Sequence, residues 1–369
     1  MSFAEPSARL TTQVCRRVDF DTAWFKSWVD TIEAAAPDGI SLASGPDRPQ
    51  FHRKNWEWAA VSQALAERGM LQPGRRGIGF AVGREPLACL FAARGADILA
   101  TDLAAGDGKT SLWSETGQHA ASLDALHWPA LLDRTNFDAR VGFMPQDMRD
   151  LKTDGLGTFD FLWSACSFEH LGSLEAGLQF VLRSMDLLKP GGIAVHTTEF
   201  NVSSVEQTLD HCDSVIYRQQ DVVDLECRLR RVACGLERPD FFAGTELDDL
   251  EYDFEPFYQN ERNHIKLMLG GFVTTSLLLI IRKGRHPGRL PPLPVPIAAP
   301  SMTPVTVPVE APTPTPPPVL ETAPVGQSAA ELEVLRLRAR LEAMERSTSW
   351  KLTEPLRAMM HLLRGGTAG

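Results

Sequence analysis

The alternation of strand-like and helix-like stretches between residues 71 and 284 is the feature that most limits the fold of this chain. Apolar runs recur there, separated by segments with helical periodicity, which is typical of a parallel sheet with helical crossovers. The runs predict strands at 76–81, 97–101, 139–144, 159–165, 191–198 and 272–282. A Pro-Gly-Gly turn at 190–192 is predicted before the fifth of these strands. We therefore expect an α/β fold that binds ligands at the carboxyl ends of its strands.

The first predicted strand ends in a turn of small residues. Gly77, Gly79, Ala81 and Gly83 occur at alternate positions, and small side chains allow backbone amides to approach a ligand closely. A helix is predicted over 86–94, because proline suits a first helical turn. Ala81 interrupts the glycine pattern, and we expect it to keep a negative φ so that its methyl group is tolerated.

An acidic residue, Asp102, ends the second predicted strand roughly 20 residues after this turn, where a carboxylate can accept hydrogen bonds from ribose hydroxyls. The glycines alone fit a dinucleotide or S-adenosylmethionine equally well. Polar residues also follow the later strands. Among them, Asp147 could accept from an adenine amino group and the backbone of Met148 could donate to the ring.

In combination, these motifs resemble the class I S-adenosylmethionine-dependent methyltransferases over residues 50–284. The resemblance implies a Rossmann-like, mostly parallel sheet of seven strands with an antiparallel last strand, and "GGFVTTSLLLIIRKG" is similar to that strand. It also implies S-adenosylmethionine as the cofactor, with the methionine part above the glycine-rich turn. The implied cofactor-binding residues are Gly79, Ala81, Gly83, Glu85, Asp102, Leu103, Asp147, Met148 and Ser164.

The chain departs from the family pattern two positions before the first glycine of the motif. The family usually has an acidic residue there, and this chain has Gly77. We expect Glu85 to take over the interaction with the amino group of the cofactor.

A methyltransferase that acts on a hydroxyl group benefits from a base near the acceptor. His170 is the first candidate, because it follows the fourth strand and neutral imidazole titrates near physiological pH. Glu199, at the end of the fifth strand, is the second, and Glu169 and His196 rank lower. A core or capping role for His170 stays open, as does catalysis by positioning alone.

The long segment between Asp102 and Phe143 exceeds an ordinary crossover, and long insertions are often functional. Flat aromatic rings suit sugars, and amide or imidazole groups suit hydroxyls, although aromatic residues also simply pack. The residues predicted to line an acceptor pocket are Trp56, Trp113, Gln118 and His119, with Arg53, Lys54 and Trp58 as further candidates.

Composition excludes several other classes of protein. The net charge of −10 argues against general nucleic-acid binding. The six cysteines form no C-x-x-C pair, so we expect reduced thiols, and no metal site is predicted. The acidic run "TELDDLEYDFEP" is interpreted as a solvated loop rather than a cation site. No secretory signal is recognised, which favours a cytoplasmic protein.

The chain is predicted to have four parts. A helical N-terminal cap covers 1–70 and the methyltransferase domain covers 71–285. More than half of the 26 prolines fall in a predicted disordered linker at 286–328. A short amphipathic or coiled-coil helix is predicted at 329–369, where it could bind a partner or the inner face of a membrane.

The C-terminal stretch "LEAMERSTSWKLTEPLRAM" resembles the ends of glycosyltransferases and polysaccharide-assembly proteins. This resemblance favours O-methylation of a sugar in a bacterial cell-envelope glycan. A small-molecule or lipid-linked acceptor is the first alternative. The second is a non-catalytic module that acts as a scaffold in glycan assembly.

Overall fold

The computed structural model describes residues 9–37, 51–104, 119–255, 257 and 263–284. All of them belong to one compact unit, residues 1–305. The predicted linker at 286–328, the predicted helix at 329–369 and the candidate residues Trp113 and Gln118 lie outside the described residues.

Helices and strands alternate along most of the chain. The helices are α1 (Ala23–Ala35), α2 (Arg53–Glu67), α3 (Leu87–Ala93), α5 (Arg134–Arg140), α6 (Leu174–Ser184), α7 (Gln219–Arg231) and α8 (Leu247–Leu250). The strands are β1 (Gln13–Val14), β2 (Arg76–Gly79), β3 (Asp97–Asp102), β4 (Val141–Pro145), β5 (Phe159–Ala165), β6 (Leu188–Asn201), β7 (Cys234–Leu236), β8 (Leu267–Leu269) and β9 (Phe272–Lys283). In the part of the chain that the structure describes, no helix is long and apolar enough to cross a membrane.

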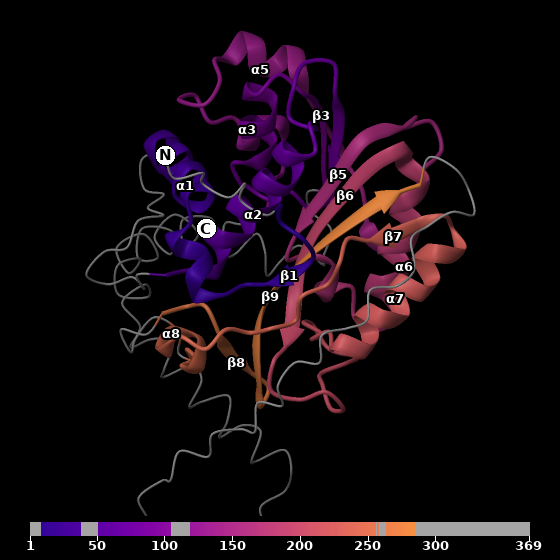
Figure 1. Ribbon diagram of the computed structural model, residues 1–369. Helices are drawn as coiled ribbons and strands as arrows, with labels where there is room; N and C mark the ends of the chain where they lie inside the picture. Colours follow the sequence, from indigo (N-terminus) through magenta and orange to yellow (C-terminus); the bar gives the residue numbers. More distant parts are fainter. Residues whose placement is uncertain (1–8, 38–50, 105–118, 256, 258–262, 285–369) are drawn as a thin grey trace, which may run out of the picture. The chain divides into compact units, whose positions relative to one another are not determined.

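The described strands form one sheet in the order β1-β9-β6-β5-β2-β3-β4, and β7 and β8 also pair with β9 (Figure 1). Strands β2 to β6 are parallel, whereas β9 is antiparallel to β6. This confirms the Rossmann-like, mostly parallel sheet with an antiparallel last strand. The described sheet has nine strands rather than seven, and the short β1, β7 and β8 lie outside the six ranges predicted from the sequence.

Strand β9 is paired along both of its edges. One edge pairs with β6 from Thr274 to Arg282. The other is shared by three short strands, because β8 pairs with 272–274, β1 with 277–278 and β7 with 281–283. Strand β9 is therefore interior to the sheet although it is the last strand in sequence.

Helices cover both faces of the sheet, with α1, α2 and α3 on one face and α6 and α7 on the other (Figure 1). Strand β5 shows the alternation clearly. Phe161 and Trp163 belong to the core beneath α2 and α3, and Leu162 belongs to the opposite core. Because both faces of β5 are buried, its sequence is mainly apolar, with Asp160 and Ser164 as its two polar residues, and this made its bounds predictable.

The N-terminal segment shares this core. Helix α2 starts after His52, whose Nδ1 accepts a hydrogen bond of 3.0 Å from the N–H of Lys54. Further along α2, Trp56 is completely buried, and its Nε1–H donates to Asp19 at 2.9 Å. The described residues before β2 therefore pack against the sheet, and β1 joins it.

The Pro-Gly-Gly sequence at 190–192 does not form the predicted turn before the fifth strand. It lies inside β6, where Phe159 of β5 pairs with Leu188 but Phe161 pairs with Ile193. The extra residues of β6 bulge out of the ladder between these two pairs. That turn prediction is wrong, because pairing with β5 resumes on both sides of the three residues.

We predict that Gly77→Ala lowers the free energy of unfolding by about 1–3 kcal/mol. A Cβ atom at Gly77 would lie 2.2 Å from the ring of Phe161. Gly142→Ala, on β4 of the same sheet, is the matched control, because its Cβ would meet no atom closer than 3.6 Å. Urea unfolding measures both variants, and equal stability would contradict this account of the packing.

Candidate functional site

The carboxyl ends of β2, β3, β5 and β6 meet at one edge of the sheet, because these strands are parallel and adjacent. We call this edge the carboxyl edge. The residues at or just after these strand ends include Glu85, Asp102, Glu169 and Glu199. The first turn of α2 is bonded to the same edge through Arg53 and other side chains.

The turn after β2 is closed by hydrogen bonds to the end of β3. The N–H of Val82 donates to the carbonyl of Thr101 at 3.1 Å, and the N–H of Gly83 donates to Oδ2 of Asp102 at 3.0 Å. Both Ala81 and Gly83 have positive φ, at 46° and 52°. The expectation of a negative φ at Ala81 is therefore wrong, and its left-handed backbone costs about 1–2 kcal/mol.

Gly79 is small for a different reason than the one predicted. A Cβ atom at this position would lie 2.3 Å from the ring of Trp163 on the neighbouring strand. Packing within the sheet therefore demands glycine there, whether or not a ligand lies above the turn.

Asp102 is buried and accepts three backbone hydrogen bonds. Its Oδ1 accepts from the N–H of Leu103 at 2.8 Å, and its Oδ2 accepts from Gly83 and from Ala120 at 3.3 Å. Burial nevertheless raises the pKa of Asp102 above its ordinary value. The imidazole of His119 lies 2.9 Å from the carbonyl of Leu103, so the fold brings these three predicted residues together.

Glu199 is held in an ion pair rather than left open to a substrate. Both of its oxygens accept from the guanidinium of Arg53, and Oε2 also accepts from the hydroxyl of Thr274 at 2.8 Å. The carboxylate of Glu199 is nearly inaccessible to solvent. Its main effect at this edge is to fix α2 to β6.

The environment of the Glu169 carboxyl group is more unusual than the sequence indicated. It is fully buried, its Oε2 accepts from the hydroxyl of Thr198 at 3.1 Å, and its Oε1 has no hydrogen-bond partner among the described residues. Burial, reinforced by the negative charge of Glu199, raises the pKa of Glu169 to about 8. Sequence reasoning ranked Glu169 below His170, because position after a strand does not reveal burial.

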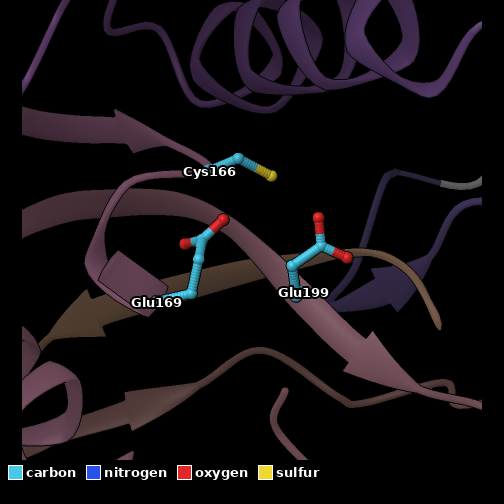
Figure 2. A group of neighbouring side chains, drawn as sticks. All are labelled: Cys166, Glu169 and Glu199. Atoms are coloured by element: carbon cyan, nitrogen blue, oxygen red, sulfur yellow. The ribbon is translucent and has the colours of Figure 1, made fainter. Parts of the chain in front are cut away.

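Cys166 and Glu169 project toward Glu199 at the ends of β5 and β6 (Figure 2). Their potential ligand atoms lie within 4.8 Å of one another, a spacing that can hold a metal ion. However, Arg53 already pairs with Glu199, and the thiol of Cys166 donates to Glu57 at 3.0 Å. We therefore describe these groups as a hydrogen-bonded cluster and assign no metal to it.

The backbone at Cys166 is also unusual. Its φ of 44° places a non-glycine residue in the left-handed region directly after β5. Its N–H donates to the hydroxyl of Thr197 at 3.0 Å, which stabilises this conformation. Burial, followed by the nearby carboxylate of Glu57, raises the pKa of the Cys166 thiol, so the sulfur stays protonated.

His170 ends a short 3-10 helix, Phe168–His170, and is partly exposed. Its Nδ1 lies 2.7 Å from the carbonyl oxygen of Asp213. Because a carbonyl only accepts, Nδ1 carries the hydrogen, and the neutral ring has its lone pair on Nε2. Burial lowers the pKa of His170, which favours this neutral form.

Three other predicted site residues have buried side chains. Trp56 is a core residue bonded to Asp19, and Ser164 is fully buried and lies 2.8 Å from Nδ1 of His196. Neither side chain is accessible in this structure, and their contacts with a ligand stay predictions. The side chain of Met148 is also in the core, so only its backbone contact with adenine stays a prediction.

Asp147 caps the 3-10 helix Met148–Asp150. Its side chain accepts from the N–H of Arg149 at 2.9 Å and pairs with the guanidinium of the same residue. The capping role considered from the sequence is therefore present. Its predicted contact with adenine stays a prediction, because part of the side chain remains accessible.

No protein-family model matches this chain, and no curated protein matches it. Solved structures of methyltransferases align with it at low similarity. Magnesium protoporphyrin IX methyltransferase from Synechocystis PCC 6803, with bound S-adenosylhomocysteine, is 11% identical, with a TM-score of 0.38 over 73% of this chain and 98% of that chain.

Two further structures are S-adenosylmethionine-dependent methyltransferases. The protein from Mesorhizobium loti is 14% identical, with a TM-score of 0.36 over 61% of this chain and 99% of that chain. The protein from Clostridium acetobutylicum is 12% identical, with a TM-score of 0.34 over 73% and 95%. All three scores are low, so the fold assignment rests on the strand order and register described above.

We predict that the free energy of unfolding falls as the pH rises toward about 8, because the folded protein holds a proton on Glu169 that the unfolded chain has already released. The unfolded chain releases this proton near the ordinary value of about 4.3, whereas the folded protein keeps it until about pH 8. Ionisation therefore stabilises the unfolded state between these values, by an amount on the order of a few kcal/mol.

Glu169→Gln removes this contribution. The free energy of unfolding of the variant minus that of the wild type should therefore rise from pH 5 to pH 8 and then level off. Denaturant unfolding across this range measures the difference. Glu206→Gln, at an exposed position, is the control. A difference that does not change with pH would show that Glu169 ionises normally in the folded protein.

Proposed function

We propose that the protein is an S-adenosylmethionine-dependent methyltransferase that binds its cofactor at the carboxyl ends of β2 and β3. The observation that carries this proposal is the buried carboxylate of Asp102, which joins the end of β3 to the turn after β2. Three backbone N–H groups use three of its roughly four acceptor positions. One position is left for a ribose hydroxyl, so the residues present fit the cofactor.

The register of the sheet supports a place for the adenine beside β4. Asp102 pairs with Pro145 across β3 and β4, so Asp147 follows only two residues beyond the neighbouring strand end. Its carboxylate and the backbone of Met148 would then flank the adenine ring. Gly83, on the other side of Asp102, places the turn beneath the methionine part.

S-adenosylmethionine, when bound, supplies a methyl group activated by a positively charged sulfur. The chain must orient an acceptor for in-line attack and receive its proton. His170 suits the second task, because the carbonyl of Asp213 holds Nδ1–H and directs the lone pair to Nε2. Glu199 suits it less, because both of its oxygens are engaged by Arg53.

For the acceptor we propose a hydroxyl group of a cell-envelope sugar. Imidazole and carboxyl groups at the ends of β5 and β6 can accept hydrogen bonds from hydroxyls, and the resemblance of the C-terminal segment to polysaccharide-assembly proteins supports a glycan. Trp56 lies in the core, so the proposal does not rest on it. A small-molecule or lipid-linked acceptor is the alternative, and a non-catalytic scaffold would need neither substrate nor cofactor.

We predict that Asp102→Asn weakens binding of S-adenosylhomocysteine by about 1–3 kcal/mol, because an amide cannot accept from all of these donors at once. Titration calorimetry measures the affinity. Asp97→Asn, at the amino end of the same strand, is the matched control and should bind like wild type. Absence of binding to folded wild-type protein would refute the proposed function, and an unchanged affinity in Asp102→Asn would remove Asp102 from the site.

We predict that His170→Ala lowers the rate of methyl transfer by roughly a hundredfold while leaving the affinity for S-adenosylhomocysteine unchanged. Transfer of labelled methyl groups into polysaccharide, lipid and small-molecule fractions of a bacterial envelope extract gives the rate and the acceptor class. His211→Ala, an exposed histidine, is the control. Near wild-type transfer by His170→Ala would mean that positioning alone drives the reaction.

A further inference from the structure

One ammonium group connects α2 to the turn after β2. The Nζ of Lys54 lies 2.9 Å from Oε1 of Glu85 and 3.1 Å from Oε2 of Glu57, and it is 3.5 Å from the carbonyl oxygen of Ala165. Lys54 belongs to the first turn of α2, whereas Glu85 lies between β2 and α3. The Lys54–Glu85 pair therefore spans the turn above which the cofactor's methionine part is proposed to bind.

The two carboxylates around Lys54 have different surroundings. Glu57 is buried, and its Oε1 also accepts from the hydroxyl of Ser276 at 2.5 Å and from the thiol of Cys166. Glu57 is thus fixed by several donors. The side chains of Lys54 and Glu85 remain 30% and 14% exposed, so this pair can exchange partners with a ligand.

The charges at this position are unequal. Two carboxylates face one ammonium, so Lys54 keeps Glu57 as a partner when Glu85 turns to a ligand. A molecule that carries one ammonium and one carboxylate can pair with Glu85 and Lys54 at the same time. Such a ligand leaves the local net charge unchanged, and each ion in the Lys54–Glu85 pair exchanges one partner for another.

The turn itself offers no other acid for this task. Gly77 stands where the family that the sequence resembles usually has an acidic residue, and a Cβ atom there would lie 2.2 Å from Phe161. A carboxylate side chain therefore has no space at that position. Glu85 is the carboxylate next along the chain from the glycine-rich turn.

We propose that the Lys54–Glu85 pair opens to bind the amino-acid end of the cofactor, with Glu85 accepting from its α-ammonium group and Lys54 donating to its α-carboxylate. This inference rests on the proposed function. It adds Lys54 of α2 as a cofactor-binding residue. It also makes α2 the element that closes over the methionine part.

The test compares two ligands by calorimetry on the full chain. S-adenosylhomocysteine carries the amino-acid end, and 5′-methylthioadenosine has the same nucleoside and a thioether without it. In Lys54→Met and Glu85→Gln, the affinity for S-adenosylhomocysteine should fall about tenfold or more, while the affinity for 5′-methylthioadenosine stays unchanged. Lys189→Met, which removes an ion pair with Asp160 at the amino end of β5, is the matched control and should bind both ligands normally.

A second measurement changes the ligand as well as the protein. Wild-type protein should bind S-adenosylhomocysteine more tightly than its carboxamide derivative, whereas Lys54→Met should bind the two equally. This double-mutant cycle isolates the contact between Lys54 and the carboxylate of the ligand. Equal losses for both nucleosides in the variants would overturn the inference, and so would an unchanged affinity for S-adenosylhomocysteine. If wild-type protein binds 5′-methylthioadenosine but does not prefer S-adenosylhomocysteine, this inference fails while the nucleoside site stands.

Discussion

The ion pair between Arg53 and Glu199 is the contact on which the carboxyl edge depends. It joins the first turn of α2 to the end of β6, and both side chains are almost inaccessible to water. Each charge is tolerated there because the other is present, since an unpaired buried ion costs several kcal/mol. Lys54 and Glu57 belong to the same helical turns as Arg53. The Arg53–Glu199 pair therefore also sets the positions from which Lys54 contacts Glu85 and Glu57 contacts Cys166. The N-terminal segment therefore contributes side chains to the carboxyl edge as well as covering the sheet.

Local sequence signals were sufficient for the central strands and insufficient where partners are distant. Strand β5 has the predicted bounds, because a strand buried on both faces is mainly apolar along its length. Strand β1 was missed, because its two residues become a strand only through β9. The Pro-Gly-Gly sequence in β6 was misread as a turn for the same reason. Its local signal is that of a turn, but pairing with β5 keeps the strand continuous.

The sequence could predict those candidate site residues that lie directly at the ends of strands. Asp102 and Leu103 lie at the end of β3, where the sequence placed a ligand-binding carboxylate, and the fold brings His119, predicted for the acceptor pocket, to the same place. The sequence could not distinguish an aromatic residue that lines a pocket from one that fills the core, and Trp56 proved to be the second kind. Nor could the sequence show that Glu169 has an unusual pKa, because the burial of this carboxyl depends on how separate elements pack around it.

The double pairing of β9 has a consequence for how the chain is made. Gln13 and Val14 find their partners at Leu278 and Leu277, so almost the entire domain must be synthesised before β1 can form. Contacts between such distant positions close slowly, because a long loop must be ordered before the pairing stabilises it. Until β9 emerges from the ribosome, the free edge of β6 resembles the open sheet edges that recruit other chains. The nascent protein is therefore most exposed to aggregation just before its final strand is added.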